Sequence, residues 1–246
     1  MQDMKWIKWN NLGAAYDHQK LYTKVHLSTL MHNWLNIGHQ KQKFYDNAVS
    51  VCPICNATKE TWEHIFQCEH DDAITLCTVS HTQFKSDLIK LNIAPIIRAI
   101  LCYKVAKWCN LPDILVPQVP TNEVGDAVRD AVEQQSRVGW SKFMKGRVVK
   151  SWSEAYLLYA DAMPTNNKNK MLDKDLCLSK VITVVWSMFC ILWNARNAHL
   201  HMEFDQIDAS LINKQIRKAF CTQAFHVSVG LSPLPQTPSR TSQIPP

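Results

Sequence analysis

Residues 52–68 read Cys-Pro-Ile-Cys-Asn-Ala-Thr-Lys-Glu-Thr-Trp-Glu-His-Ile-Phe-Gln-Cys. The spacing is C-x2-C-x8-H-x3-C, which can bring three thiolates and one imidazole around a single metal ion. Cys52 and Cys55 fit a tight turn, and a short helix would put His64 and Cys68 on one face. Four such ligands without a carboxylate favour tetrahedral Zn2+, and a filled shell leaves no open position for catalysis. The pattern therefore predicts a structural zinc site.

Two alternatives to this ligand set stay open. The four residues could be unrelated buried side chains, since free cysteine is among the most buried residue types. That interpretation leaves unexplained why three of the nine cysteines crowd beside one histidine. His70 could replace one ligand, although its spacing from Cys55 is less usual.

Composition indicates a folded chain that could bind a polyanion. The 246 residues are 46% hydrophobic and 20% charged, which is ordinary globular usage and enough for one sizeable core or two small domains. Only six glycines occur, which argues against glycine-rich nucleotide folds, and the net charge is +6. An odd number of cysteines and an N-terminus without an apolar leader predict an intracellular protein, nuclear or cytoplasmic and not secreted.

Hydrophobic periodicity predicts a mostly α fold, a helical bundle with one small zinc-stapled knuckle. The most apolar run, Val181–Trp193, has 13 residues. A membrane span needs about 20, so we expect a buried core helix and no membrane contact. The first predicted helix carries an apolar stripe and ends at Gly38; the stripe is Leu27, Leu30, Met31, Trp34 and Leu35. Two further helices are predicted to begin at a cap, Asp71 or Asp72, and at Pro95. The remaining predicted helices cover 122–145, 148–159, the stretch from Asp173 or Asp175 through His201, and 210–225.

Proline content marks the predicted domain boundaries. Residues 109–121 hold three prolines and predict a linker. This linker separates a helical segment, 1–108, which bears the zinc-binding module 52–68, from a helical domain, 122–228. Five of the last sixteen residues are proline, so we expect a disordered tail over 229–246.

Several segments carry a family resemblance. Cys52-Pro-x-Cys55, Glu60-Thr61 and His64-Ile65-Phe66-x-Cys68 resemble the zinc-binding domain downstream of the polymerase in non-LTR (LINE-like) retrotransposon reverse transcriptases. The resemblance implies a non-catalytic region that binds RNA or target DNA, with a reverse transcriptase domain upstream in the parent element, in a truncated or domesticated copy. Three further segments resemble the same family in the expected order: His32-x-Trp34-Leu35 with the run His39-Gln40-Lys41, the block from Glu133 to Arg147 with Trp152, and Trp193-x-x-Arg196-Asn197-x-x-x-His201.

Two basic segments are candidate nucleic-acid contacts. The first has no acidic residue from His18 to Tyr45, and the second interleaves cations with Trp140 and Trp152, which could stack on bases. Ordinary solvated lysine faces are the alternative, and we favour a core position for the two tryptophans because they fall on the apolar stripe. The candidate contacts are Lys20, Lys24, Lys41, Lys43, Arg137, Lys142, Lys145, Arg147 and Lys150.

No catalytic set emerges from the sequence. Tyr159-Ala160-Asp161-Ala162 lacks the second carboxylate of a polymerase box, and carboxylates suited to a polymerase or RNase H are not found. Arg196-Asn197-x-x-x-His201 also resembles the motif of HEPN-type ribonucleases, in which arginine holds the phosphate and histidine acts in acid–base catalysis. A plain helix end is the simpler interpretation of this motif. A zinc-stapled module that binds another protein is a third possibility.

Overall fold

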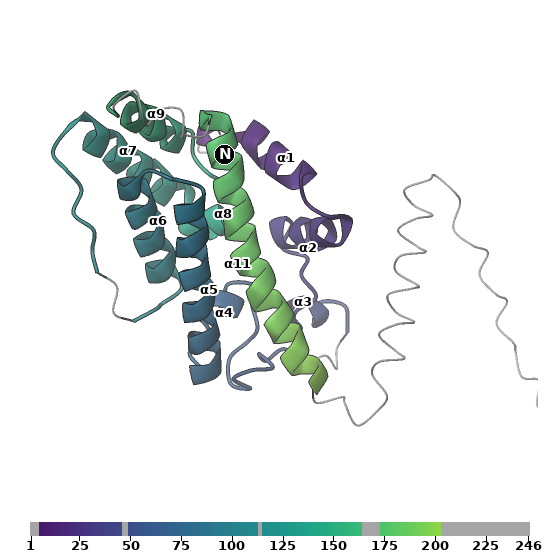
Figure 1. Cartoon of the computed structure of the whole chain (residues 1–246). Coiled ribbons are helices and arrows are strands. Elements are labelled where there is room, and N and C mark those ends of the chain that lie inside the picture. Colours follow the sequence, from purple (N-terminus) through teal and green to yellow (C-terminus); the bar gives the residue numbers. More distant parts are fainter. Residues whose placement is uncertain (1–4, 46–48, 113–114, 164–172, 203–246) are drawn as a thin grey trace, which may run out of the picture. The chain divides into compact units, whose positions relative to one another are not determined.

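The computed structural model describes residues 5–45, 49–112, 115–163 and 173–202. These residues form helices and two isolated β-bridges, with no strand among them, so the mostly α prediction is confirmed (Figure 1). The helices are α1 (Trp9–Asp17), α2 (Leu21–Met31), α3 (Gly38–Lys41), α4 (His64–Gln67), α5 (Asp71–Lys90), α6 (Pro95–Trp108), α7 (Glu123–Val138), α8 (Trp140–Met144), α9 (Ser151–Asp161) and α11 (Lys174–Met202).

The long helix α11 is the common packing partner of the N-terminal helices and the knuckle region. Aromatic pairs connect α1, α2 and α4 to it, with ring centroids 6.5 Å apart for Tyr16–Trp186, 6.1 Å for His26–Trp193 and 6.2 Å for Phe66–Phe189. Figure 1 shows α11 running between α5 and α6 on one side and α1 and α2 on the other. These contacts lie within residues 1–199, which form one compact unit.

The length and composition of α11 alone would allow it to cross a membrane. Within Leu176–Leu200, an 18-residue window reaches a mean hydropathy of 1.9, but 67% of that window is buried inside the protein. Two of its hydroxyls bond within the helix, since Thr183 donates to the Ser179 carbonyl and Ser187 to the Thr183 carbonyl. This burial is typical of a core helix, and the lack of membrane contact stays a prediction.

Residues before and after the predicted linker contribute to the same core. Helix α5 packs on α6, α7 packs on α9, and α6 contacts α8 and α9. The buried hydrophobic cluster runs from Ile7 to Trp193 and includes Val105 before the linker and Val128 after it. The described parts of 1–108 and 122–228 therefore share one hydrophobic interior.

Local signals set several helix starts as predicted. Pro95 occupies the first turn of α6, where its missing N–H loses no hydrogen bond. The Asp173 carboxylate accepts a bond from the Leu176 N–H at 3.3 Å and caps α11. At α5 the expected caps were wrong. His70 is the cap, with its Nδ1 accepting from the Asp72 N–H at 3.3 Å, and the two aspartates lie in the first turn.

The prediction that one helix continues through Trp34 and Leu35 was wrong. Helix α2 ends at Met31, and Asn33 takes a left-handed φ of 58°, a conformation that asparagine tolerates at helix ends. Leu35 is buried, but Trp34 is 74% exposed. Gly38 begins α3 and does not end the preceding helix.

The predicted helix over 122–145 divides in two. Gly139 has a φ of 105°, which interrupts the chain between α7 and α8. A residue with a Cβ would be strained there. The predicted helix over 210–225 and the predicted disordered tail over 229–246 lie outside the described residues.

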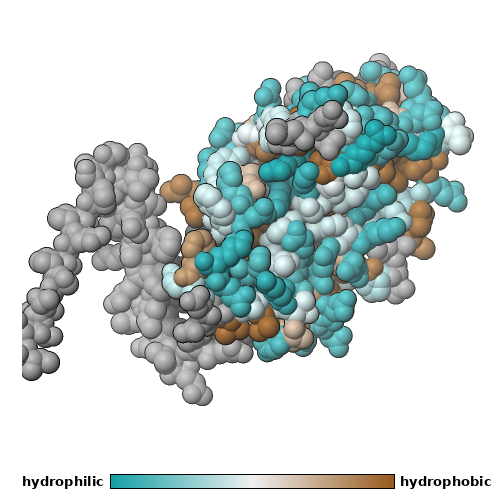
Figure 2. Space-filling view, turned by 180° about the vertical axis from the view of Figure 1, so that it is seen from behind, coloured by the Kyte–Doolittle hydropathy of each residue, from teal (hydrophilic) through white to brown (hydrophobic). Residues whose placement is uncertain are grey.

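Large apolar side chains also reach the surface. Figure 2, seen from behind, shows a face covered mainly by hydrophilic side chains, with small hydrophobic groups near its edges. Besides Trp9, six large apolar residues within the first 45 positions are exposed: Leu21, Tyr22, Val25, Trp34, Phe44 and Tyr45.

Candidate metal centre

The two N-terminal ligand candidates lie on a small turn. Val51 and Lys59 form an antiparallel bridge, and the Cys52 N–H donates to the Thr58 carbonyl at 2.8 Å. Inside it, the Asn56 N–H donates to the Cys52 carbonyl at 2.8 Å, with Asn56 in a left-handed conformation. This closes the chain on itself between Cys52 and Cys55, as the C-x2-C spacing predicts.

The other two candidates lie at the two ends of α4. The Thr61 hydroxyl accepts from the His64 N–H at 3.2 Å and so starts this single turn. The turn is anchored by apolar packing, because Phe66 is buried and the Trp62 ring stacks on Trp108 with centroids 5.8 Å apart. Helix α4 therefore presents His64 and Cys68 to the same side, as the short-helix prediction requires.

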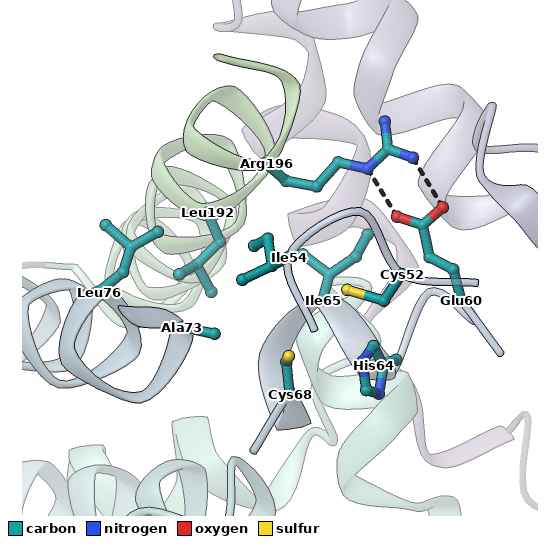
Figure 3. Close-up of a pocket in the computed structure, with 10 residues that line it drawn as sticks. All are labelled: Cys52, Ile54, Glu60, His64, Ile65, Cys68, Ala73, Leu76, Leu192 and Arg196. Carbon is teal, nitrogen blue, oxygen red and sulfur yellow. Dashed lines mark hydrogen bonds and ion pairs between the residues drawn. The ribbon is translucent and has the colours of Figure 1, made fainter. Parts of the chain in front are cut away.

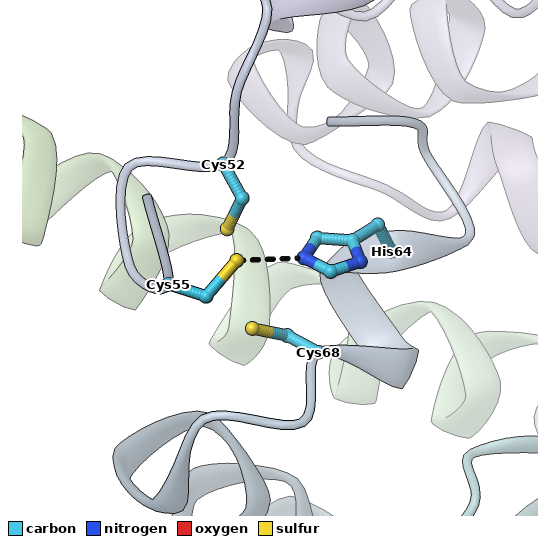
Figure 4. A group of neighbouring side chains, drawn as sticks. All are labelled: Cys52, Cys55, His64 and Cys68. Carbon is cyan, nitrogen blue, oxygen red and sulfur yellow. Dashed lines mark hydrogen bonds between the residues drawn. The ribbon is translucent and has the colours of Figure 1, made fainter. Parts of the chain in front are cut away.

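The four candidate ligands converge. Their ligand atoms all lie within 4.8 Å of one another, and the Cys55 Sγ is 3.4 Å from the His64 Nε2. Figure 4 shows the three sulfurs and the imidazole edge facing a common centre. Three sulfurs and one imidazole nitrogen at this separation can hold a metal ion. His70 is exposed and occupied in capping α5, so it takes no part in the cluster.

The electrostatics of the cluster favour a cation at its centre. Burial would raise the pKa of Cys55, but the N–H groups of Ala57 and Thr58, with His64, lower it to about 6. Hydrogen bonding to Cys52, with help from Cys55, raises the pKa of His64 to about 9. Burial and the neighbouring sulfurs Cys52 and Cys55 raise the pKa of Cys68 to about 12. The third thiolate is therefore disfavoured by burial and by the negative charge beside it, and a divalent cation would stabilise it.

A buried ion pair joins this cluster to α11. The Arg196 Nε donates to the Glu60 Oε1 at 2.6 Å and the Arg196 Nη2 to the Glu60 Oε2 at 2.7 Å (Figure 3). Both residues are at most 4% exposed. The pair lines one pocket together with Cys52, His64 and Cys68, with Leu192 of α11 on the apolar side. No local sequence pattern predicts this contact, because its two residues are 136 positions apart.

Glu60 also ties α3 to the knuckle. The Gly38 N–H donates to the Glu60 Oε2 at 2.7 Å, and the His39 N–H donates to the Glu60 carbonyl at 3.2 Å. A Cβ at position 38 would lie 2.7 Å from the Ser50 backbone, so only glycine allows this approach. One carboxylate thus connects α3, the knuckle and α11.

In the alternative ribonuclease motif, the Arg196 side chain already has partners within the protein. The Arg196 guanidinium is occupied by Glu60, and its Nη1 donates to the Asn197 Oδ1 at 2.9 Å. The side chain of His201 lies outside the described part of the chain. Because a phosphate could reach Arg196 only by breaking a buried ion pair, the observed arrangement disfavours this alternative.

The candidate nucleic-acid residues fall in different environments. Lys20, Lys43 and Lys150 are exposed. Arg137 is exposed but pairs with Glu133. Partly exposed are Lys24, Lys41, Lys142 and Arg147.

Lys145 is the exception, and its prediction as a contact residue was wrong. It is 6% exposed, its Nζ lies 3.9 Å from the centroid of the Trp62 ring, and it donates to the Asn33 Oδ1. A flexible cationic side chain is thus used to join α8 to the loop after α2. Burial lowers its pKa to about 8, against the opposing charge of Glu63.

The buried Lys145 makes stability depend on alkaline pH. The folded pKa is about 8 against an ordinary value of 10.5, so between these values the unfolded chain binds more protons and stability rises with pH. We expect the free energy of unfolding of the parent to gain about 2–3 kcal/mol over that of Lys145→Met across this window. Urea denaturation of both proteins from pH 7 to pH 10.5 measures the difference, and parallel pH profiles would contradict the assignment.

The aromatic residues of the second basic segment are largely internal. Trp152 is 1% exposed, which confirms its core position. Trp140 is half-buried, packs on Phe143 with centroids 5.1 Å apart, and donates from its Nε1 to the Ser136 Oγ at 3.2 Å. Neither ring is presented as a flat platform to solvent, so this segment offers cations without stacking surfaces.

The acidic residues near Lys59 in the sequence act on other cations. Lys59 is exposed, whereas Glu60 is buried against Arg196 and the charge of Glu63 acts on Lys145. Glu60 is therefore neutralised by a cation other than Lys59. In the described residues, no carboxylate forms an ion pair with Lys59, Lys41 or Lys43.

The chain matches no protein-family model, no curated protein and no solved structure. The site is therefore interpreted from its own chemistry.

Proposed function

We propose that Cys52, Cys55, His64 and Cys68 bind one Zn2+ that staples the knuckle. The support is the donor set, because three sulfurs and an imidazole suit tetrahedral zinc better than magnesium, calcium or manganese, which prefer oxygen. With all four positions filled by protein, the ion would hold the turn at Cys52–Cys55 against α4 and leave no site for a substrate.

We further propose that the zinc-stapled protein binds nucleic acid without catalysis. The observation that carries this proposal is the positive charge beside the knuckle at Lys41, Lys43 and Lys59, with which no carboxylate of the described residues forms an ion pair. Lysines that lack protein carboxylates nearby can release counterions from phosphates, which drives association. The resemblance to the C-terminal zinc-binding region of non-LTR retrotransposon reverse transcriptases supports the same function, with RNA or target DNA as partner and an intracellular location.

Salt dependence tests the binding proposal. We expect fluorescence anisotropy with a labelled polynucleotide to show affinity falling with salt concentration, with a log–log slope of about −2 to −3 if three lysines contact phosphates. The double variant Lys43→Glu/Lys59→Glu should bind at least about 10-fold more weakly and with a shallower slope.

The matched control for this experiment is Lys85→Glu/Lys90→Glu, which changes the net charge equally. Both lysines are exposed on α5, and Lys85 is 14 residues beyond Asp71, about 21 Å along the helix. The control should keep most of the parent affinity. Equal losses in the two double variants would mean that net charge alone acts, and no retention at low salt would end the proposal.

The competing functions predict other outcomes. A ribonuclease would cleave RNA without metal and lose activity in His201→Ala. A zinc-stapled protein-interaction module would retain a protein partner after nuclease treatment and show no salt-dependent binding to polynucleotides.

A further inference from the structure

Three exposed aromatic residues flank α3 in the sequence, one before it and two after it. Trp34 is 74% exposed, Phe44 79% and Tyr45 69%. A folded protein commonly exposes single apolar residues, but three large rings within twelve positions call for a partner. We name the following set the α3 patch: the rings of Trp34, Phe44 and Tyr45 and the lysines Lys41, Lys43 and Lys59.

Hydrogen bonds hold the backbone of the α3 patch in place. The Gln40 Nε2 donates to the Asn33 carbonyl at 2.5 Å, which connects α3 to the segment carrying Trp34. The Phe44 and Tyr45 N–H groups donate to the Lys41 carbonyl at 3.0 and 2.9 Å. Since α3 is itself bonded to Glu60, the rings project from backbone that is fixed to the knuckle. A backbone that is already ordered lowers the entropy cost of binding.

The lysines of the α3 patch lie in or near the same short helix, since Lys41 belongs to α3 and the His39 N–H donates to the carbonyl of Glu60, which follows Lys59. Burial and then the charges of Lys59 and Lys43 lower the pKa of His39, so both ammonium groups act on one imidazole in α3. The nearest acid on the knuckle side, Glu60, is buried against Arg196. The patch therefore combines flat apolar rings with positive charge that described carboxylates do not neutralise.

We propose that the α3 patch binds single-stranded nucleic acid, with its rings stacking on unpaired bases and its lysines contacting phosphates. The inference rests on the proposed nucleic-acid function and adds the strandedness of the partner and the residues that select it. Every base has a π-face, so rings beside cations bind single strands with little dependence on sequence. In a duplex the bases are already stacked on each other, and only the lysines would find partners.

Conservative substitutions at Trp34 and Phe44 separate stacking from simple apolar contact. Trp34→Phe and Phe44→Tyr keep a ring, whereas Trp34→Leu and Phe44→Leu keep apolar surface without one. The probes are a labelled single strand of about 12 nucleotides and a duplex of the same length. Single-strand-binding domains cover about 4–16 nucleotides each, so the strand is long enough to fill one site. Anisotropy is measured on the zinc-loaded full chain at one fixed salt concentration.

We expect each leucine variant to bind the single strand about 10-fold more weakly than the parent. The ring-keeping variants should remain within about 3-fold, and duplex affinity should hardly change. The control Ile89→Ala removes an exposed apolar side chain on α5, 50% exposed, and should bind like the parent. Because all the substituted side chains are exposed, we expect every variant to keep the zinc content and the unfolding temperature of the parent. Measuring both excludes misfolding as the cause of a loss of affinity.

The outcomes distinguish the α3 patch proposal from the proposed nucleic-acid binding on which it rests. If the parent binds polynucleotides but the leucine variants keep full single-strand affinity, the α3 patch proposal is overturned and nucleic-acid binding survives. If leucine and ring-keeping variants lose affinity equally on single strand and duplex, stacking is also excluded. If the parent retains neither probe at low salt, both proposals fail.

Discussion

Cys52→Ala is expected to remove zinc from the protein and unfold the knuckle. Structural zinc contributes folding free energy directly, with apparent values of about 10–16 kcal/mol in isolated zinc-finger peptides. Here Trp62 and Phe66, which lie on either side of His64 in the sequence, belong to the main hydrophobic core. We therefore expect the helical body to survive with a lowered unfolding temperature, while the segment from Val51 to Cys68 loses protection against hydrogen exchange.

Atomic absorption on purified protein measures the zinc content. The parent should carry about one equivalent and Cys52→Ala essentially none. Cys190→Ala is the matched control, because Cys190 is a half-buried free cysteine on α11 outside the cluster. A Cys52→Ala protein that keeps a full equivalent would remove the metal assignment.

Acid should release the metal from the parent. Protons compete with zinc for the three thiolates and for the imidazole of His64, so affinity falls as pH falls and binding releases protons. Titration with a chromogenic chelator at several pH values measures this competition.

The second large effect is expected at Arg196. Arg196→Ala leaves the Glu60 carboxylate buried with the Gly38 N–H as its remaining described hydrogen-bond partner. Breaking a buried ion pair from one side costs about 3–5 kcal/mol, because the remaining charge stays desolvated. For a chain of this size the unfolding temperature should fall by roughly 10 °C.

Two further variants separate the ion pair from side-chain volume. Glu60→Gln/Arg196→Met removes both charges and should recover part of the lost stability, since no charge is left buried. Arg129→Ala is the control, because Arg129 forms an exposed ion pair with Asp126 and should cost at most about 1 kcal/mol. If Arg196→Ala and Arg129→Ala were equally mild, the ion pair would not hold α11 to the knuckle.

The same substitution should weaken zinc binding. Glu60 joins the knuckle to α3 and α11, so its displacement loosens the segment that positions Cys52 and His64. We expect chelator competition to show a lower zinc affinity in Arg196→Ala than in Arg129→Ala.

Several features of this protein follow from short segments of sequence. The C-x2-C turn and the single turn of α4 bring four ligands together within 17 residues, and spacing alone predicts that convergence. Pro95 and Asp173 begin their helices through their own backbone and side-chain chemistry. Such features are predictable because the atoms that interact are a few bonds apart along the chain.

Other features depend on residues that are distant in sequence. Glu60 and Arg196 are 136 positions apart, and Lys145 and Asn33 are 112 apart. Residue type predicted neither the burial of these charges nor the resulting positive surface at Lys59. One local feature could have indicated the exposure of Trp34: Asn33 directly before it, because asparagine readily takes the left-handed conformation that ends a helix. Local spacing determines how a turn closes. The partner of a buried charge is decided only when the helices pack, because packing removes water from the charged group and a partner from elsewhere in the chain must then replace it.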